Sequence, residues 1–304
     1  MNSIHRIMAR WWVRPIAFIA LTLAFYMAYI LIYYDHPAYI VAGGTRDNIF
    51  LFISLMLASG IIESLRAESR FWAFGIRIDC WMGRDLGFAI SLNFIIYIFF
   101  IIAFLIAGAE FGHDTRYGMD SREHLWYFLS GVIFLLFGAA NEELMFRGII
   151  FQSIMQRFSP GAAAFVTAAA FSALHMGNPD IGAIAYINIF LAGLLLSVMY
   201  IQTLSLWLPI FFHFFWNIFQ PVFLGMPISG VYYGRVEWNV MNDANNPAMR
   251  LIFGGGFGIE GGLMCTFVLI ALIYISARYA KQSPYMAART FRRNIAESRL
   301  MYRS

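Results

Sequence analysis

Long runs of apolar residues, separated by short polar segments, make up most of this chain. An α-helix needs about 20 mainly apolar residues to cross a bilayer, so runs of this length predict membrane-spanning helices. We expect eight spans, of which the second and fifth are short. They cover residues 15–34, 48–62, 86–109, 125–147, 161–175, 181–202, 206–224 and 257–279. The pattern predicts an all-α, multi-pass membrane helical bundle.

Composition supports this class. Hydrophobic residues make up 61% of the chain and charged residues 12%, against about half and a quarter in soluble domains. We therefore expect one integral-membrane domain over residues 1–304. The first apolar run is of spanning length and no small-residue cleavage site follows it, which predicts a retained first span rather than a secretory signal.

Basic residues predict the orientation, because cytoplasmic loops carry an excess of Lys and Arg. They gather in the first 14 residues, in the segment 63–85 and in the tail 281–304. The loops 35–47, 110–124 and 225–256 contain fewer basic residues. Eight spans with both termini in the cytoplasm agree with all of these segments.

The sequence pI of about 9.1 is explained by these loops and does not indicate a nucleic-acid partner. We expect the tail 281–304 to contact anionic lipid head groups, with docking to a partner protein as the alternative. The chain has no N-x-[ST] sequon, which fits a protein of the bacterial plasma membrane.

Two adjacent carboxylates and an arginine lie near the end of the apolar run that begins at Leu125. Ionisable residues inside a membrane are costly and are candidates for a functional site. Glu143 and Arg147 are four residues apart and share a helix face, whereas Glu142 points about 100° away. The two carboxylates are therefore expected to have different roles.

Three further polar side chains occur in apolar spans. His175 ends one span, and His213 and Asn217 share a helix face in another. A single His in a bundle is more often a packed hydrogen-bonding group than a catalyst. If both helices start from one shared turn, Glu142 and His175 lie level to within about one helical turn. The set therefore predicts a common site.

These residues form three motifs, Glu142-Glu143-x-x-x-Arg147, Phe171-x-x-x-His175 and His213-x-x-x-Asn217. Together they resemble the motifs of the CAAX-processing and bacteriocin-processing (CPBP, or Abi) intramembrane endopeptidases, which are related to the type II CAAX prenyl endopeptidase. The resemblance covers about a third of the chain, so we expect the catalytic core at 125–224. It implies cleavage of a membrane-associated protein or peptide.

The resemblance also implies roles for the residues. Glu142 would be the general base and His175 its partner on the water, while His213 and Asn217 would donate to the tetrahedral oxygen. This chemistry is reasonable, since peptide hydrolysis needs a base and preorganised donors. Glu143 most simply pairs with Arg147 as a supporting contact, although Arg147 could instead hold a substrate carboxylate.

Cofactor use and other functions stay open at this point. The chain has no HExxH motif, and we expect no cofactor. Zinc is the alternative, with Glu142, His175 and His213 as ligands. A proton-coupled carrier would also use intramembrane Glu and His, but the chain shows no inverted repeat. The remaining alternative is a non-proteolytic scaffold or bacteriocin-immunity factor.

One glycine-rich stretch, Gly254–Gly262, contains Glu260. Small residues at this density are typical of close helix approach in membrane bundles, and this is the simpler interpretation. As the alternative, Glu260 is a candidate supporting residue, which would contact the catalytic residues rather than the substrate.

Overall fold

The computed structural model describes residues 7–33, 37–65, 75–76, 78, 81–109, 111–113, 121–231, 236–238 and 246–279. The basic tail 281–304 lies outside this part of the chain, as do Arg66, Arg70 and Arg77. The cytoplasmic location of both termini therefore stays a prediction, together with the boundaries of the proposed tail.

Helices make up nearly all of the described structure. They are α2 (Val13–Tyr33), α3 (Pro37–Ser64), α4 (Trp81–Ile106), α5 (Ser121–Arg147), α6 (Ile149–Arg157), α7 (Pro160–Leu174), α8 (Ala183–Thr203), α9 (Trp207–Ile218), α11 (Pro247–Phe253) and α12 (Leu263–Tyr279). A π-helical turn, η1 (Phe219–Phe223), continues α9, and the 3₁₀ turns η2 (Gly255–Phe257) and η3 (Ile259–Gly261) precede α12. A helix lies at each of the eight predicted spans, which confirms the all-α class.

Within the described residues, five helical segments are long and apolar enough to cross a membrane, judged by length and composition. They are Val13–Tyr33, Gly44–Ser64, Trp81–Ile106, Phe128–Arg157 and Ala183–Thr203. Pro160–Leu174 and Leu263–Arg278 are shorter apolar helices. These helices support an integral membrane protein, and the exact count of eight spans remains a prediction.

The distribution of side chains is that of a protein surrounded by lipid. Large apolar residues such as Leu31 and Ile106 point outward, where hydrocarbon is as favourable an environment as a protein core. Polar residues are buried between helices instead. On α4, for example, the buried Asn93 donates from Nδ2 to the backbone oxygen of Phe212 on α9, at 3.2 Å.

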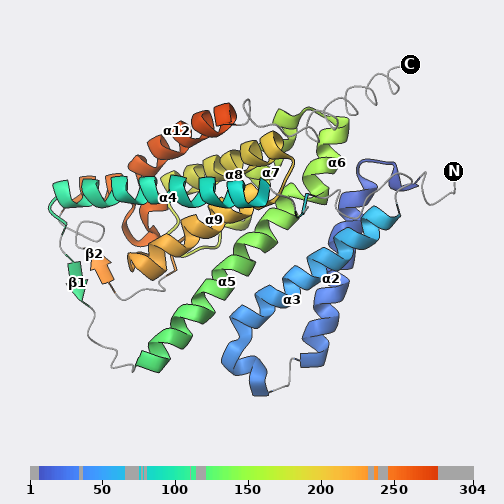
Figure 1. The fold of residues 1–304 in the computed structure, drawn as a ribbon, viewed down its shortest axis with the longest axis horizontal. Helices are drawn as coiled ribbons and strands as arrows, with labels where there is room; N and C mark the ends of the chain where they lie inside the picture. Colours follow the sequence, from blue (N-terminus) through green and yellow to red (C-terminus); the bar gives the residue numbers. More distant parts are fainter. Residues whose placement is uncertain are drawn as a thin grey trace.

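Helix α5 runs between two groups of helices (Figure 1). On one side the antiparallel α2 and α3 pack together, and α3 packs on α5. On the other side α9 packs on α5, on α4 and on α8, while α8 packs on α7 and α12. Helix α5, which carries Glu142 and Glu143, therefore contacts both groups of helices.

Local sequence determines where the helices near these carboxylates begin and end. At Gly148, between α5 and α6, an added Cβ would lie 2.3 Å from the backbone oxygen of Leu144, so only glycine fits this break. Helix α7 begins at Pro160 after the cap Ser159, whose Oγ accepts a hydrogen bond from the backbone nitrogen of Ala162. Pro at the first helical position and Ser at the cap are both favourable there.

The segments predicted as loops contain more structure than the apolar pattern indicated. Strands β1 (Phe111–His113) and β2 (Val236–Trp238) pair antiparallel, with Gly112 opposite Glu237. Helix α11 lies inside the predicted loop 225–256, and the last predicted span begins as 3₁₀ turns. The regular helix of this last span starts late because Gly254, Gly255 and Gly258 adopt positive φ values, which interrupt a helix.

Candidate active site

Glu143 is completely buried on α5 and accepts two hydrogen bonds on one oxygen. Its Oε1 lies 3.1 Å from Nη1 of Arg147, one turn later, and 2.9 Å from Nδ1 of His213 on α9. The other terminal nitrogen of Arg147, Nη2, donates to the backbone oxygen of Gly193 on α8 at 2.8 Å. This buried ion pair therefore ties α5 to both α8 and α9.

The glycine at position 193 is required by the packing of α7 on α8. A Cβ there would lie 2.9 Å from the Cα of Ala168 on α7, closer than carbon atoms normally pack. The absence of a side chain lets α7 approach α8, while the Gly193 carbonyl is reached by Arg147 from the other side.

Phe171, the first residue of the second motif, packs against three of the ionisable groups. Its ring centroid lies 4.7 Å from that of His175 and 6.2 Å from that of His213. The guanidinium carbon of Arg147 lies 5.0 Å from the same ring. The aromatic ring thus fixes both histidines from one side and offers its face to the buried cation.

Glu142 is in a different environment from its neighbour. Its side chain is 38% exposed, and its Oε2 lies 3.8 Å from Nε2 of His213. The imidazole of His213 therefore lies between two carboxylates, with Nδ1 bonded to Glu143 and Nε2 facing Glu142. Since a carboxylate only accepts hydrogen bonds, Nδ1 of His213 carries a hydrogen.

His175 caps the C-terminal end of α7 and is half-buried. Its Nδ1 lies 2.8 Å from the backbone oxygen of Phe171, one turn earlier in the same helix. A carbonyl oxygen accepts and cannot donate, so this nitrogen carries a hydrogen. In the neutral ring, Nε2 of His175 is then the nitrogen with a free lone pair.

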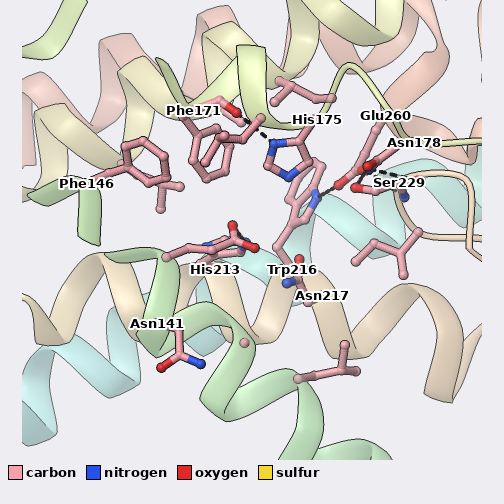
Figure 2. Close-up of a pocket in the computed structure, with 18 of the residues that line it drawn as sticks. Asn141, Phe146, Phe171, His175, Asn178, His213, Trp216, Asn217, Ser229 and Glu260 are labelled. Carbon is pink, nitrogen blue, oxygen red and sulfur yellow. Dashed lines mark hydrogen bonds and ion pairs between the residues drawn. The ribbon is translucent and has the colours of Figure 1, made fainter. Parts of the chain in front are cut away.

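A cavity of about 450 Å³ brings the predicted catalytic residues together. Glu142, His175, His213 and Asn217 all line it. Figure 2 shows His175 approaching from α7, opposite His213 and Asn217 on α9. Apolar side chains such as Leu51 of α3 line other parts of the wall, and further polar side chains such as Asn48 and Glu260 also face the cavity.

The structure also shows contacts that the motifs did not predict. The expected pairing of Glu143 with Arg147 is present, but Glu143 also binds His213, which lies 70 residues away in the sequence. Glu142 and His175 line the same cavity, and the described part of the chain shows no hydrogen bond between them. Glu142 approaches His213 instead.

Two residues that line the cavity were not predicted from the sequence to belong to the site. Trp216, between His213 and Asn217, lines the cavity and binds Glu260. Asn141, next to Glu142, also lines the cavity and donates to the backbone oxygen of Asn48 on α3. Their placement next to motif residues was the only sign in the sequence that they face the site.

The zinc alternative, with Glu142, His175 and His213 as ligands, stays a prediction. Nδ1 of His213 is bonded to Glu143, so Nε2 is the nitrogen with which this ring could bind a metal. In the part of the chain that the structure describes, no three His, Cys, Asp or Glu side chains come together as ligands. We therefore derive no step of the reaction through a metal.

Comparison with known proteins agrees with the position of this cavity. No curated protein matches the chain, and no solved structure matches it either. One family model does match, described as type II CAAX prenyl endopeptidase Rce1-like, over residues 124–219. This match covers α5 to α9 and so includes all three motifs. The segment of this integral membrane protein that carries Glu142, His175, His213 and Asn217 is therefore an Rce1-like domain.

Proposed function

We propose that this protein is an intramembrane endopeptidase that hydrolyses a peptide bond in a membrane-associated protein or peptide. The observation that supports it best is the convergence of Glu142, His175, His213 and Asn217 on one cavity, within the segment matched by the endopeptidase family model. A base, a water-orienting group and hydrogen-bond donors are what peptide hydrolysis requires.

Glu142 is the general base in this proposal. Its carboxylate is partly exposed to the cavity, where it accepts one proton of a bound water. The free lone pair on Nε2 of His175 accepts a hydrogen bond from the same water and so orients it. The water oxygen then forms a bond to the carbonyl carbon of the substrate.

His213 and Asn217 stabilise the negative oxygen that develops on the former carbonyl. The Asn217 amide donates from Nδ2, and His213 donates from Nε2. Because Nδ1 of His213 is already committed to Glu143, Nε2 carries a hydrogen only when the ring is an imidazolium. The carboxylates on both sides balance that charge, as Arg147 balances Glu143.

The second half of the reaction returns the proton. The tetrahedral intermediate collapses, the bond between carbon and nitrogen breaks, and the proton held by Glu142 passes to the leaving amine. The new carboxyl group and the new amino terminus then leave the cavity. No charge is gained or lost by the protein over the cycle.

The substrate class follows from the family and the setting. A membrane-associated protein is expected, because the site lies among apolar helices and the family description names CAAX prenyl endopeptidases. We place the protein in the bacterial plasma membrane, as a multi-pass protein with eight spans. Purified protein should be given a CAAX peptide with and without a farnesyl group, which tests whether prenylation of the substrate is needed.

Glu142→Gln tests the proposal, because it keeps the size of the side chain and removes the base. Membranes from cells that produce the wild type or the variant should be compared for new protein termini by mass spectrometry. We expect precursors to accumulate with Glu142→Gln, at an unchanged level of folded protein. Asp180→Asn is the matched control, since Asp180 is an exposed carboxylate in the loop after α7.

Two outcomes would contradict the proposal. Identical sets of termini with the wild type and Glu142→Gln, together with no cleavage of either peptide, would favour a scaffold or a carrier. Full activity of purified Glu142→Gln would show cleavage without this residue and would remove it from the mechanism.

A further inference from the structure

Glu260 lies in the 3₁₀ turn η3 and lines the cavity. Its Oε1 accepts a hydrogen bond from Nε1 of Trp216 at 2.7 Å. Its Oε2 accepts two from Ser229, one from the backbone nitrogen at 3.0 Å and one from Oγ at 2.8 Å. The carboxylate therefore joins two separate parts of the chain, as Figure 2 shows.

The first of these parts is α9. Trp216 is buried and directly precedes Asn217, and it lies three residues after His213, on the same helix. Holding the indole nitrogen fixes the rotation of α9 about its axis at the point where both proposed oxyanion donors project. The backbone oxygen of Trp216 is held as well, by the Tyr97 hydroxyl at 2.8 Å.

The second part is the turn that follows His175. Asn178 donates from Nδ2 to the backbone oxygen of Ser229 at 3.1 Å. The backbone nitrogen of Asn178 in turn donates to the backbone oxygen of His175 at 3.0 Å. A continuous chain of hydrogen bonds thus runs from the His175 turn through Ser229 and Glu260 to α9.

The backbone around Glu260 is itself fixed from α8. Nδ2 of Asn188 donates to the backbone oxygens of Glu260 and Gly262, at 2.7 and 2.9 Å. The glycines of the stretch allow the close contacts that this needs. At Gly258, for instance, an added Cβ would lie 2.1 Å from the backbone oxygen of Pro227, in the loop that carries Ser229.

We propose that Glu260 is a positioning residue of the active site, which sets the His175 turn and α9 at the separation that the reaction needs. This inference rests on the proposed function. It gives the Gly254–Gly262 stretch a role beyond close packing, because the glycines bring one carboxylate to donors from both walls of the cavity.

Glu260→Gln is the test, because an amide keeps the size of the side chain but its nitrogen cannot accept a hydrogen bond. Either the Trp216 contact or the contact with the backbone nitrogen of Ser229 must then be lost, because both of these partners can only donate. We expect kcat to fall by about 10²-fold with KM little changed, since small displacements near the reacting atoms cost rate of this order. Asp180→Asn controls for the loss of a carboxylate in the neighbouring loop and should keep wild-type activity.

Two further variants keep the test informative if Glu260→Gln fails to fold. Trp216→Phe removes the indole donor together with part of the ring, and Ser229→Ala removes the hydroxyl while the backbone nitrogen still donates. Each should lower kcat with KM little changed, and less than Glu260→Gln does where that variant folds. Combining Trp216→Phe with Glu260→Gln should lower it little further, because both act through the same contact.

A spectroscopic measurement separates this inference from the proposed function. In protein labelled with 5-fluorotryptophan, the ¹⁹F resonance of Trp216 is assigned as the one that Trp216→Phe removes. Glu260→Gln should shift it, whether or not the protein cleaves a substrate. An unshifted resonance, or a raised KM with kcat intact, would overturn the positioning role. Wild-type cleavage with unaltered kcat in Glu260→Gln would overturn it and leave the proposed function standing.

Discussion

Glu143 makes two contacts at once, and their effects on stability and activity can be separated. Glu143→Ala removes the partner of a buried guanidinium, which then keeps its hydrogen bond to the Gly193 carbonyl and its contact with the Phe171 ring. Breaking a buried ion pair by removing one partner typically costs about 3–5 kcal/mol, because it leaves a charge uncompensated. We expect a loss of that order in the free energy of unfolding, measured by titration with SDS in mixed micelles.

The double variant Glu143→Ala/Arg147→Met removes both charges. Replacement of a whole buried pair by apolar side chains is often neutral, so we expect much of the lost stability to return. Activity should not return, because Nδ1 of His213 still lacks the acceptor that lies 2.9 Å away in the wild type. Loss of the carboxylate that orients a catalytic His lowers kcat by about 10⁴-fold in a serine protease, and we expect about 10² or more here.

The assay therefore measures kcat and unfolding free energy on the same preparations of wild type, single and double variants. Recovery of both quantities in the double variant would refute the reasoning. It would show that Glu143 acts only through Arg147 and that its bond to His213 is incidental. A stability loss below about 1 kcal/mol in Glu143→Ala would show that the buried charge finds another partner, contrary to the general cost of an unpaired ion.

Other predictions concern the donors and the metal. His213→Ala and Asn217→Ala should each lower kcat by about 10²–10³-fold with KM nearly unchanged, as for loss of an oxyanion donor; a raised KM with kcat intact would instead identify a binding contact. Cleavage should survive prolonged treatment with a strong chelator, with metal content by mass spectrometry well below one ion per chain. Activity that follows zinc occupancy in one sample would overturn this and make His213 a ligand.

The sequence was sufficient for most of the helices and for four residues that line the cavity, Glu142, His175, His213 and Asn217. Apolar run length located the helices, and the spacing of Glu143 and Arg147 correctly predicted their ion pair within α5. Helical periodicity also predicted that the side chains of Glu142 and Glu143 point in different directions. It could not show which helix each carboxylate faces, because that depends on how α5 packs between two groups of helices.

The contacts that sequence reasoning missed all depend on tertiary structure. His213 and Glu143 are 70 residues apart, and Trp216 and Glu260 are 44 apart. The strand pairing of Phe111 with Trp238 joins two segments with no distinctive pattern. Apolar periodicity reports only whether a side chain faces inward. It contains no information about the partner that it meets there.

The orientation of His175 has a consequence for how the site can change. Its Nδ1 is held by the carbonyl of Phe171 in its own helix, so the tautomer follows from the backbone and needs no second side chain. If His175 were oriented by a carboxylate instead, that carboxylate would be a further charge among apolar helices, at a cost of several kcal/mol. His213 depends on Glu143 in a distant helix, so a replacement at either of those positions must be matched at the other. The orientation of His175 therefore does not depend on any one side chain of another helix. The orientation of His213 does, so Glu143 on α5 and His213 on α9 can be replaced only together.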